Sequence, residues 1–308
     1  MSNKGVRAQI ILVGAFFFIF GFITWVNGTL IPYLRIACEL KEWQAYLVTF
    51  AFYISYTVMA IPSSVVLAAT GMVKGMRLGL AIMSGGCLLF IPAAMARSYP
   101  LFLAGLFIIG TGTTLLQTAV NPYITLLGPA DKAAQRMSIM GICNKFAGVL
   151  APLILGAIIL SNSDGLLNEL KELSPYARAV RLDELARAVI VPYIILAVFL
   201  LLTAFGIGYA HLPEISAGRM DTVTMNGGAA ERNHLRNFIM GFIATFCCVG
   251  LEVMAGDTIG NYGLYHGMPL SIARHLTSYT LAFTMAGYLF GALAIPRIIS
   301  QERAFLLS

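Results

Sequence analysis

The sequence predicts an all-helical integral membrane protein, and two observations carry this prediction. First, 58% of its residues are hydrophobic and only 11% are charged, whereas about 25% of the residues in an average soluble protein are charged. Second, the apolar residues form continuous runs of roughly 20 residues, which is the length that a helix needs to cross a hydrocarbon core of about 30 Å. A transmembrane β-barrel would instead alternate apolar and polar residues in segments of about ten.

Eight such runs follow one another, at residues 9–33, 43–70, 77–96, 99–127, 135–160, 189–211, 236–262 and 270–298. The connections between the first five runs are short, as expected between antiparallel neighbours. Residues 161–188 have a helical pattern of their own, which predicts an outer amphipathic segment. Residues 212–235 are polar and Gly-rich, which is typical of a flexible linker. The expected organisation is therefore a six-helix half (1–211), a cytoplasmic linker (212–235) and the start of a second half (236–308).

The orientation follows from the basic residues near the helix ends. The first run is too long for a signal peptide and no cleavage site follows it, so it stays as a helix. With the N-terminus in the cytoplasm, the inner side collects Lys4, Arg7, Lys74, Arg77, Lys132, Arg136, Arg219, Arg232, Arg236, Arg297 and Arg303. The short outer loops hold four bases. Topology thus explains the net charge of +6, and no basic patch interleaved with aromatics points to a nucleic-acid partner.

The first and seventh runs can be aligned as a repeat at a constant offset of 229 residues, so that Arg7 lies over Arg236. Phe17, Gly21, Thr29 and Tyr33 then also meet identical residues. Many transporters consist of two related halves. The alignment is a hypothesis, because five identities in a Gly- and Phe-rich background can also arise by chance.

Three charged residues lie well inside the predicted spans, namely Lys145, Glu252 and Asp257. A charge at the bilayer centre costs about 2.5–3.5 kcal/mol on insertion scales, so each needs a reason. One interpretation is that these three charged residues take part in the function of the protein. The alternatives are that Lys145 and Glu252 neutralise one another, and that Asp257 is a solvated acid at a helix end.

Uncharged polar residues also gather in the spans. Thr114, Gln117 and Asn121 follow i, i+3, i+7 spacing and share one helix face, and Asn144 stands beside Lys145. Amides pair with sugar hydroxyls, and aromatic rings stack on the apolar face of a sugar. The alternative is that such groups join helices or form the interfacial aromatic belt. The predicted sugar contacts are Trp25, Asn27, Tyr53, Thr114, Gln117, Asn121 and Asn144.

The other chemically reactive residues of the sequence do not indicate an enzyme. The four histidines form no constellation with Ser or Cys, and the chain has no Gly-rich loop that would bind ATP phosphates. The five cysteines lack metal-binding spacing and are expected to pack in apolar surroundings. We expect a monomer without catalytic residues, metal or organic cofactor, whose partners are the lipid bilayer, a sugar and a coupling ion.

Four motifs resemble the fucose/galactose/glucose symporter family of the major facilitator superfamily. They are "FFFIFGFITWVNGTLIPYL", "LLQTAVNPYITLLGP", "RMSIMGICNKFAGVLAP" and "CCVGLEVMAGDTIGNYG". Within that family, the chain looks most like the bacterial glucose/galactose branch. The resemblance implies a twelve-helix bundle in the bacterial inner membrane, with a central sugar cavity between two halves and ion-coupled uptake by alternating access. Eight of twelve helices are present, so we expect a C-terminally truncated transporter that is inactive alone.

The family's residues carry over in part. The Asp on the first helix of the fucose transporters, which is linked with proton coupling, falls on Gly28, and their helix 4 Glu falls on Gln117. Asn121 and Asn144 are retained. In the repeat alignment Gly28 lies opposite Asp257, so our hypothesis is that Asp257 or Glu252, with Lys145 nearby, couples transport to protons. Sodium coupling, facilitated diffusion and a non-transporting sugar-binding or scaffold remnant are the alternatives.

Overall fold

A computed structural model describes residues 3–127, 132–159, 170, 172–209, 231–295, 298–300 and 303. For a few of these, including Asn27, it describes the backbone only. The described part is helical throughout, without a strand. Its elements are α1 (Asn3–Ala37), α2 (Glu42–Ala45), α3 (Leu47–Thr70), α4 (Met72–Met95), α5 (Tyr99–Leu126), α6 (Ala133–Ile159), α8 (Pro175–Arg187), α9 (Ile190–Tyr209), α11 (Glu231–Tyr265) and α12 (Leu270–Ala294).

Eight segments of the described chain are long and apolar enough to cross a membrane. They run over 9–37, 43–70, 72–95, 99–126, 133–155, 175–209, 236–265 and 271–294, which confirms all eight predicted spans. The sixth joins α8 to α9. Because α8 carries five charged residues while the 20 residues of α9 carry none, α9 alone is the apolar part, and its length of about 30 Å matches a hydrocarbon core. Of the predicted linker at 212–235, residues 212–230 lie outside the described residues, whereas residues 231–235 are helical, because α11 begins at Glu231.

Short connections fold the first helices back on one another. Gly71 ends α3 with a φ of +84°, a left-handed conformation that glycine adopts without steric cost. Its amide donates to the carbonyl of Leu67 at 2.9 Å, and its own carbonyl accepts from Gly75 at 3.0 Å. One glycine therefore closes α3 and opens α4, which makes the two helices antiparallel neighbours.

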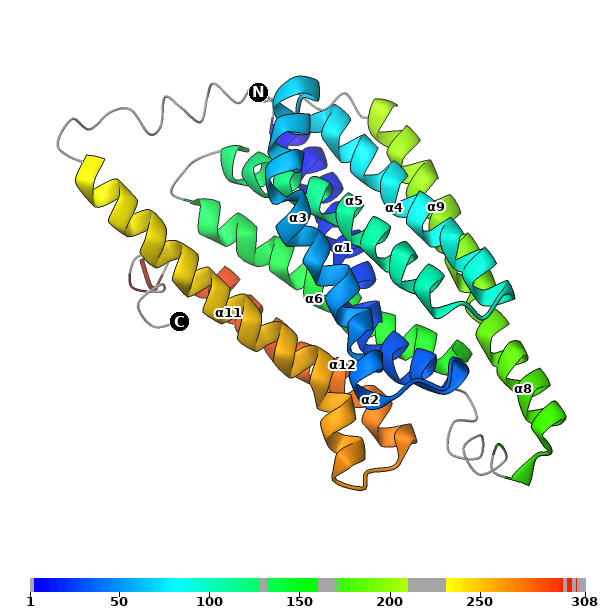
Figure 1. Ribbon diagram of the computed structural model, residues 1–308. Helices are drawn as coiled ribbons and strands as arrows, with labels where there is room; N and C mark the ends of the chain where they lie inside the picture. Colours follow the sequence, from blue (N-terminus) through cyan, green and yellow to red (C-terminus); the bar gives the residue numbers. More distant parts are fainter. Residues whose placement is uncertain are drawn as a thin grey trace.

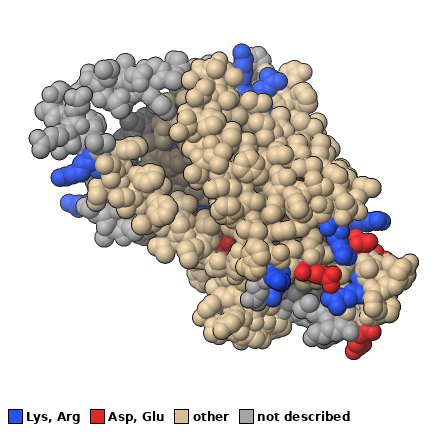
Figure 2. Space-filling model, viewed as in Figure 1, with Lys and Arg blue, Asp and Glu red and all other residues tan. Residues whose placement is uncertain are grey.

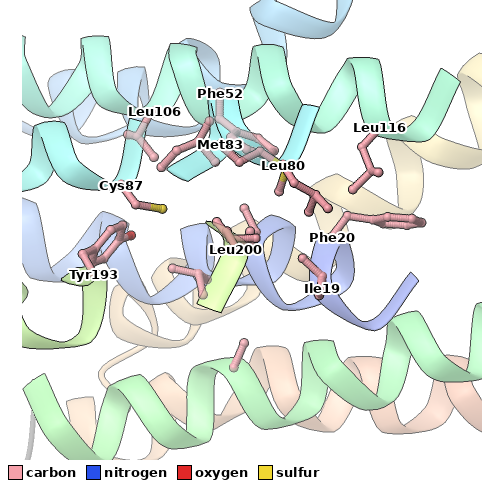
Figure 3. Packing of buried hydrophobic residues seen from close by; sticks show 14 of the residues in the cluster. Ile19, Phe20, Phe52, Leu80, Met83, Cys87, Leu106, Leu116, Tyr193 and Leu200 are labelled. Carbon is pink, nitrogen blue, oxygen red and sulfur yellow. The ribbon is translucent and has the colours of Figure 1, made fainter. Parts of the chain in front are cut away.

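Glycines let α4 and α5 approach closely. A Cβ atom added at Gly79 would lie 2.8 Å from the Gly112 carbonyl oxygen, and one added at Gly86 would lie 2.8 Å from the Ile109 amide nitrogen. Small residues at such contacts are the usual device of membrane helices, which lack a hydrophobic driving force between them. In the core beside this contact, Phe90 on α4 stacks on Tyr193 of α9 at 4.0 Å between ring centroids. Figure 3 shows Tyr193, Cys87 and Leu200 among these buried residues.

Helices α11 and α12 form a hairpin that packs against α6 and α1 (Figure 1). The α6–α12 contact is antiparallel and keeps one register over its length. Gln135 Nε2 donates to the Ala292 carbonyl at 3.2 Å near one end, and Ser278 Oγ donates to the Val149 carbonyl at 3.1 Å near the other. In contrast, the side chains of residues 236–249 on α11 are almost all exposed.

At the end of the bundle opposite the N-terminus, α8 is fixed by polar contacts. Tyr33 on α1 donates its hydroxyl to the Leu185 carbonyl at 2.6 Å. Arg97, in the turn after α4, pairs with Asp183 of α8 at 3.2 Å and with Glu39 at 3.9 Å. Figure 2 shows acidic and basic residues together at this end, whereas the end that bears the N-terminus shows Lys and Arg without acidic neighbours.

Candidate substrate and ion site

A buried charge pair joins α6 to α11 in the middle of the bundle. Lys145 on α6 forms an ion pair with Glu252 on α11, and its side chain is 5% exposed against 25% for Glu252. The Lys145 ammonium also lies 4.6 Å from the Trp25 ring centroid on α1 and 6.0 Å from the Tyr288 ring centroid on α12. Four helices therefore meet at one lysine. One alternative raised by the sequence is that Lys145 and Glu252 neutralise one another, and the ion pair agrees with that alternative.

The Trp25 indole occupies a slot between two glycines. A Cβ atom at Gly148 of α6 would lie 2.6 Å from Trp25 Cδ1, and one at Gly256 of α11 would lie 2.9 Å from Cη2. Leu281 of α12 lies 2.9 Å from the same position on Gly148. Because the ring is only 3% exposed, protein encloses it, and the Lys145 ammonium lies over its face in a cation–π interaction.

Asp257 is 4% exposed, so it is not the solvated helix-end acid considered as an alternative. Within the described part of the chain, neither of its carboxylate oxygens has a hydrogen-bond partner. The hydroxyl of Tyr53 on α3 is likewise buried without a partner there, and it lies within electrostatic range of Asp257. A carboxylate in such surroundings is strongly disfavoured in its charged form unless a proton, a cation or water compensates it.

Asn144 joins α6 to α1. Its side-chain amide donates to the Phe17 carbonyl at 3.4 Å. A Cβ atom at Gly21 would lie 2.7 Å from Asn144 Nδ2, so the missing side chain at Gly21 lets the two helices approach. Part of the hydrogen-bonding capacity of Asn144 is thus used between helices, while its half-buried side chain keeps the amide oxygen for another partner.

The polar stripe on α5 is less engaged. The Thr114 hydroxyl donates to the Gly110 carbonyl of its own helix at 2.8 Å. Gln117 is half-buried and Asn121 is exposed, and no side-chain hydrogen bond joins either of them to another described residue. Their amides are therefore available to a ligand. The side chain of Asn27 lies outside the described residues.

The structure thus brings five of the predicted site residues together, from α1, α3, α6 and α11: Trp25, Tyr53, Lys145, Glu252 and Asp257. Their roles stay predictions. Sequence reasoning noted Gly148 as leaving backbone room near Lys145, but it missed Gly256 and the slot that the two glycines form, because this slot depends on the position of a ring on another helix. It also missed Thr49, although Thr49 and Tyr53 share the i, i+4 spacing of one helix face.

Two cavities are lined in part by α1. One of about 270 Å³ has an entirely apolar lining from α1, α6 and α9 that includes Phe18, Phe22 and Phe199. The other, of about 590 Å³, lies at the end opposite the N-terminus, and its lining includes Arg35, Tyr46 and Asn261.

Comparison with known proteins decides the family. The model of the Major Facilitator Superfamily matches residues 13–307. The chain belongs to this superfamily. This membership confirms the superfamily that the four motifs resemble.

Among curated members of the superfamily, the chain is 30% identical over 306 residues to the glucose/galactose transporter of Brucella abortus. The match covers 98% of this chain and 70% of that relative. The chain is 28% identical over 297 residues to the L-fucose-proton symporter of Escherichia coli, covering 94% of this chain and 68% of the symporter.

The same architecture is seen in a solved superfamily structure. The crystal structure of the transporter FucP in the outward conformation matches with a TM-score of 0.76 at 27% identity, covering 96% of this chain and 72% of FucP. The match supports the all-helical superfamily fold that the sequence predicts. As superfamily relatives, these proteins are sugar transporters, so the chain is similar to multi-pass membrane proteins that move a sugar.

Proposed function

We propose that this chain takes part in proton-coupled hexose uptake across a bacterial inner membrane by alternating access. The observation that supports it most directly is the Asp257 carboxylate, buried without a hydrogen-bond partner in the described structure, in a chain whose relatives include a glucose/galactose transporter and an L-fucose-proton symporter. A buried carboxylate that must be neutral in one state and charged in another is suited to carry a proton.

The proposed orientation places the N-terminus in the cytoplasm. Unbalanced Lys and Arg lie at the end that bears the N-terminus, whereas the opposite end mixes both signs (Figure 2). This asymmetry is the pattern that fixes orientation in membrane proteins. The cavity of about 590 Å³ then faces the outside, from which sugar enters.

The proposed sugar site combines the amides of Gln117, Asn121 and Asn144 with Asn27, Thr114, Tyr53 and Trp25. Gln117 and Asn121 make no side-chain hydrogen bond within the described chain, so sugar hydroxyls would be their partners. Trp25, held in its slot, would in addition position Lys145 through its ring. Glu252 is engaged by Lys145, which leaves Asp257 as the stronger candidate for the coupling proton.

Uptake and counterflow in vesicles test this proposal. One preparation holds the 308-residue chain, and a second holds the chain extended by the remaining helices of the Brucella transporter, since the match covers 70% of that protein. We expect the extended chain to accumulate labelled glucose or galactose when the outside is acidic. Asp257→Asn should retain counterflow and lose accumulation, because exchange needs no net proton movement.

Each other result has a definite meaning. Accumulation driven by sodium instead of protons would show that the coupling ion is wrong. Sugar binding without exchange by either preparation would favour a non-transporting binder. Absence of binding to glucose, galactose and fucose alike would show that the substrate class is wrong.

A further inference from the structure

The cavity of about 590 Å³ lies where α1, α2 and α11 end together. Pro32, Arg35 and Ile36 of α1 form one wall, and Ala45 and Tyr46 form the second. The third wall comes from α11, with Thr258, Asn261, Tyr262, Leu264 and Tyr265. This lining is rich in polar and amphipathic side chains, in contrast to the wholly apolar cavity between α1, α6 and α9. Water can therefore occupy it.

Two helix faces lead from this cavity toward the middle of the bundle. On α11, Asn261 in the cavity wall stands one turn from Asp257, at i and i+4. Tyr46 in the wall directly precedes α3, and it follows i, i+3, i+7 spacing with Thr49 and Tyr53 on α3, so that the three share one face. At 1.5 Å per residue, Thr49 lies about 4.5 Å and Tyr53 about 10 Å along the helix from Tyr46.

The polar atoms along these two faces share an unusual property. Thr49 Oγ1, the Tyr53 hydroxyl and both carboxylate oxygens of Asp257 are all buried, and none has a hydrogen-bond partner among the described residues. Buried polar atoms in native proteins are nearly always paired with protein or ordered water. A line of polar atoms without protein partners that begins at a polar cavity is a suitable place for bridging water, since each water molecule needs two to four polar partners.

We propose that Thr49 and Tyr53 form a hydrated path that connects the cavity with Asp257 and lets protons reach this carboxyl group from the proposed outer side. The inference rests on the proposed role of Asp257 in coupling. In this path, a proton moves from cavity water along hydrogen-bonded water beside the Thr49 and Tyr53 hydroxyls and binds a carboxylate oxygen of Asp257. No other reactant is needed, and the reverse movement releases it.

Other titratable groups lie on α11 itself and on α3, α6 and α12. Tyr53 on α3 lies within electrostatic range of Asp257, and Tyr56 packs on Tyr53 with ring centroids 5.8 Å apart. Lys145 belongs to α6, Glu252 lies a turn and a half away on α11, and His275 lies on α12. Lys145 and Glu252 are paired with each other. The infrared signal of Asp257 must therefore be assigned by substitution.

The experiment follows hydrogen–deuterium exchange of the Asp257 carboxyl group by infrared spectroscopy of the full chain in lipid, with Asp257→Asn identifying its band. The test variants are Thr49→Val and Tyr53→Phe. Thr111→Val is the matched control, because the Thr111 hydroxyl on α5 is also buried without a described partner but lies on neither helix face. We expect each test variant to slow exchange by about tenfold, the equivalent of one lost hydrogen bond, and Thr111→Val to leave it unchanged.

The results separate the path from the proposed function. Equal exchange in the test variants, the control and the original chain would overturn the path while leaving Asp257 as a proton carrier. Absence of any band that Asp257→Asn removes would overturn the role of Asp257 itself.

A second measurement does not depend on Asp257. In a chain whose five cysteines are replaced by alanine, Thr49→Cys should react with a small charged methanethiosulfonate reagent, and Thr111→Cys should not. Protection of the cysteine at position 49 would show that the path is dry and the proposal wrong.

Discussion

Lys145 of α6 and Glu252 of α11 form an ion pair, and Lys145 also lies 4.6 Å from the Trp25 ring centroid. The pair connects α6 to the α11–α12 hairpin. Its two ends differ in exposure, at 5% for Lys145 and 25% for Glu252. Loss of either partner therefore has unequal consequences.

Breaking this pair should destabilise the fold asymmetrically. Glu252→Gln leaves a charged lysine with little access to water, and removal of one partner of a buried pair typically costs about 3–5 kcal/mol. Lys145→Met should cost less, because Glu252 is partly exposed. The double variant should be more stable than Glu252→Gln alone. Unfolding free energies in lipid or detergent give the double-mutant cycle.

The exposed Arg181–Glu184 pair on α8, at 2.9 Å, provides a comparison. Glu184→Gln should change stability by less than about 1 kcal/mol, as is usual for surface pairs. If Glu252→Gln lowered the free energy of unfolding no more than Glu184→Gln does, the Lys145–Glu252 pair would not stabilise the contact between α6 and the α11–α12 hairpin.

The slot around Trp25 predicts opposite effects for two glycines on α11. Gly256→Ala places a methyl group against the indole, which Gly148 confines on its other side, so we expect a loss of about 1–3 kcal/mol from overpacking. A Cβ atom at Gly250 meets nothing within 4 Å, so Gly250→Ala should be neutral or slightly stabilising through its higher helix propensity.

Fluorescence reports on the same slot. The chain has two tryptophans, and Trp43→Phe removes the exposed one. In that background, Gly256→Ala should shift the emission of Trp25 to longer wavelength by opening the slot to water, and Gly250→Ala should not. Identical spectra for the two variants would contradict the packing described for Trp25.

Substitution of Gln117 should separate sugar binding from folding. Because its amide makes no bond within the described protein, Gln117→Ala should weaken hexose binding by about tenfold, the equivalent of one hydrogen bond, with no change in melting temperature. Asn144→Ala should lower both the hexose affinity and the melting temperature, since this amide also donates to the Phe17 carbonyl.

Thr118→Val is the control for that comparison, because the Thr118 hydroxyl donates to the Thr114 carbonyl of its own helix at 2.8 Å. Calorimetric titration with glucose and galactose measures affinity, and thermal unfolding measures stability. Unaltered affinity in Gln117→Ala would remove this residue from the sugar site.

Cys38, in the turn after α1, should react slowly with maleimide. Burial raises the pKa of its thiol from 9.0 to about 11, and the positive charge of Arg97 partly opposes this effect. Because the thiolate is the reactive form, labelling at pH 8 should be about a hundredfold slower than for an ordinary thiol, and should rise about tenfold per pH unit up to the pKa. Mass spectrometry of the Cys38 peptide measures the rate.

Arg97→Gln removes the charge that lowers this pKa, so labelling of Cys38 should become slower still. N-acetylcysteine serves as the reference thiol, and Cys38→Ser confirms the peptide assignment. A Cys38 that reacts as fast as the reference at pH 8 would show that its thiol is not shielded.

The site was only partly predictable from residue types. Lys145, Glu252 and Asp257 stood out because a charge in an apolar run is costly wherever the helix packs. The slot of Trp25 between Gly148 and Gly256 did not, because a glycine in a membrane helix looks the same whether it faces lipid or a ring. Thr49 was equally inconspicuous, since only its unpaired hydroxyl in the folded bundle distinguishes it from threonines that bond their own helix.

The sequence by itself determined where the eight segments lie that are long and apolar enough to cross a membrane in the described part of the chain, because transfer of apolar side chains into hydrocarbon is a local property of about 20 consecutive residues. It also singled out the charged residues. Only the tertiary structure decided that Lys145 pairs with Glu252, that Asp257 is buried beside Tyr53, and that α12 packs on α6. Those contacts depend on the rotation and register of whole helices, which are set by packing between distant segments.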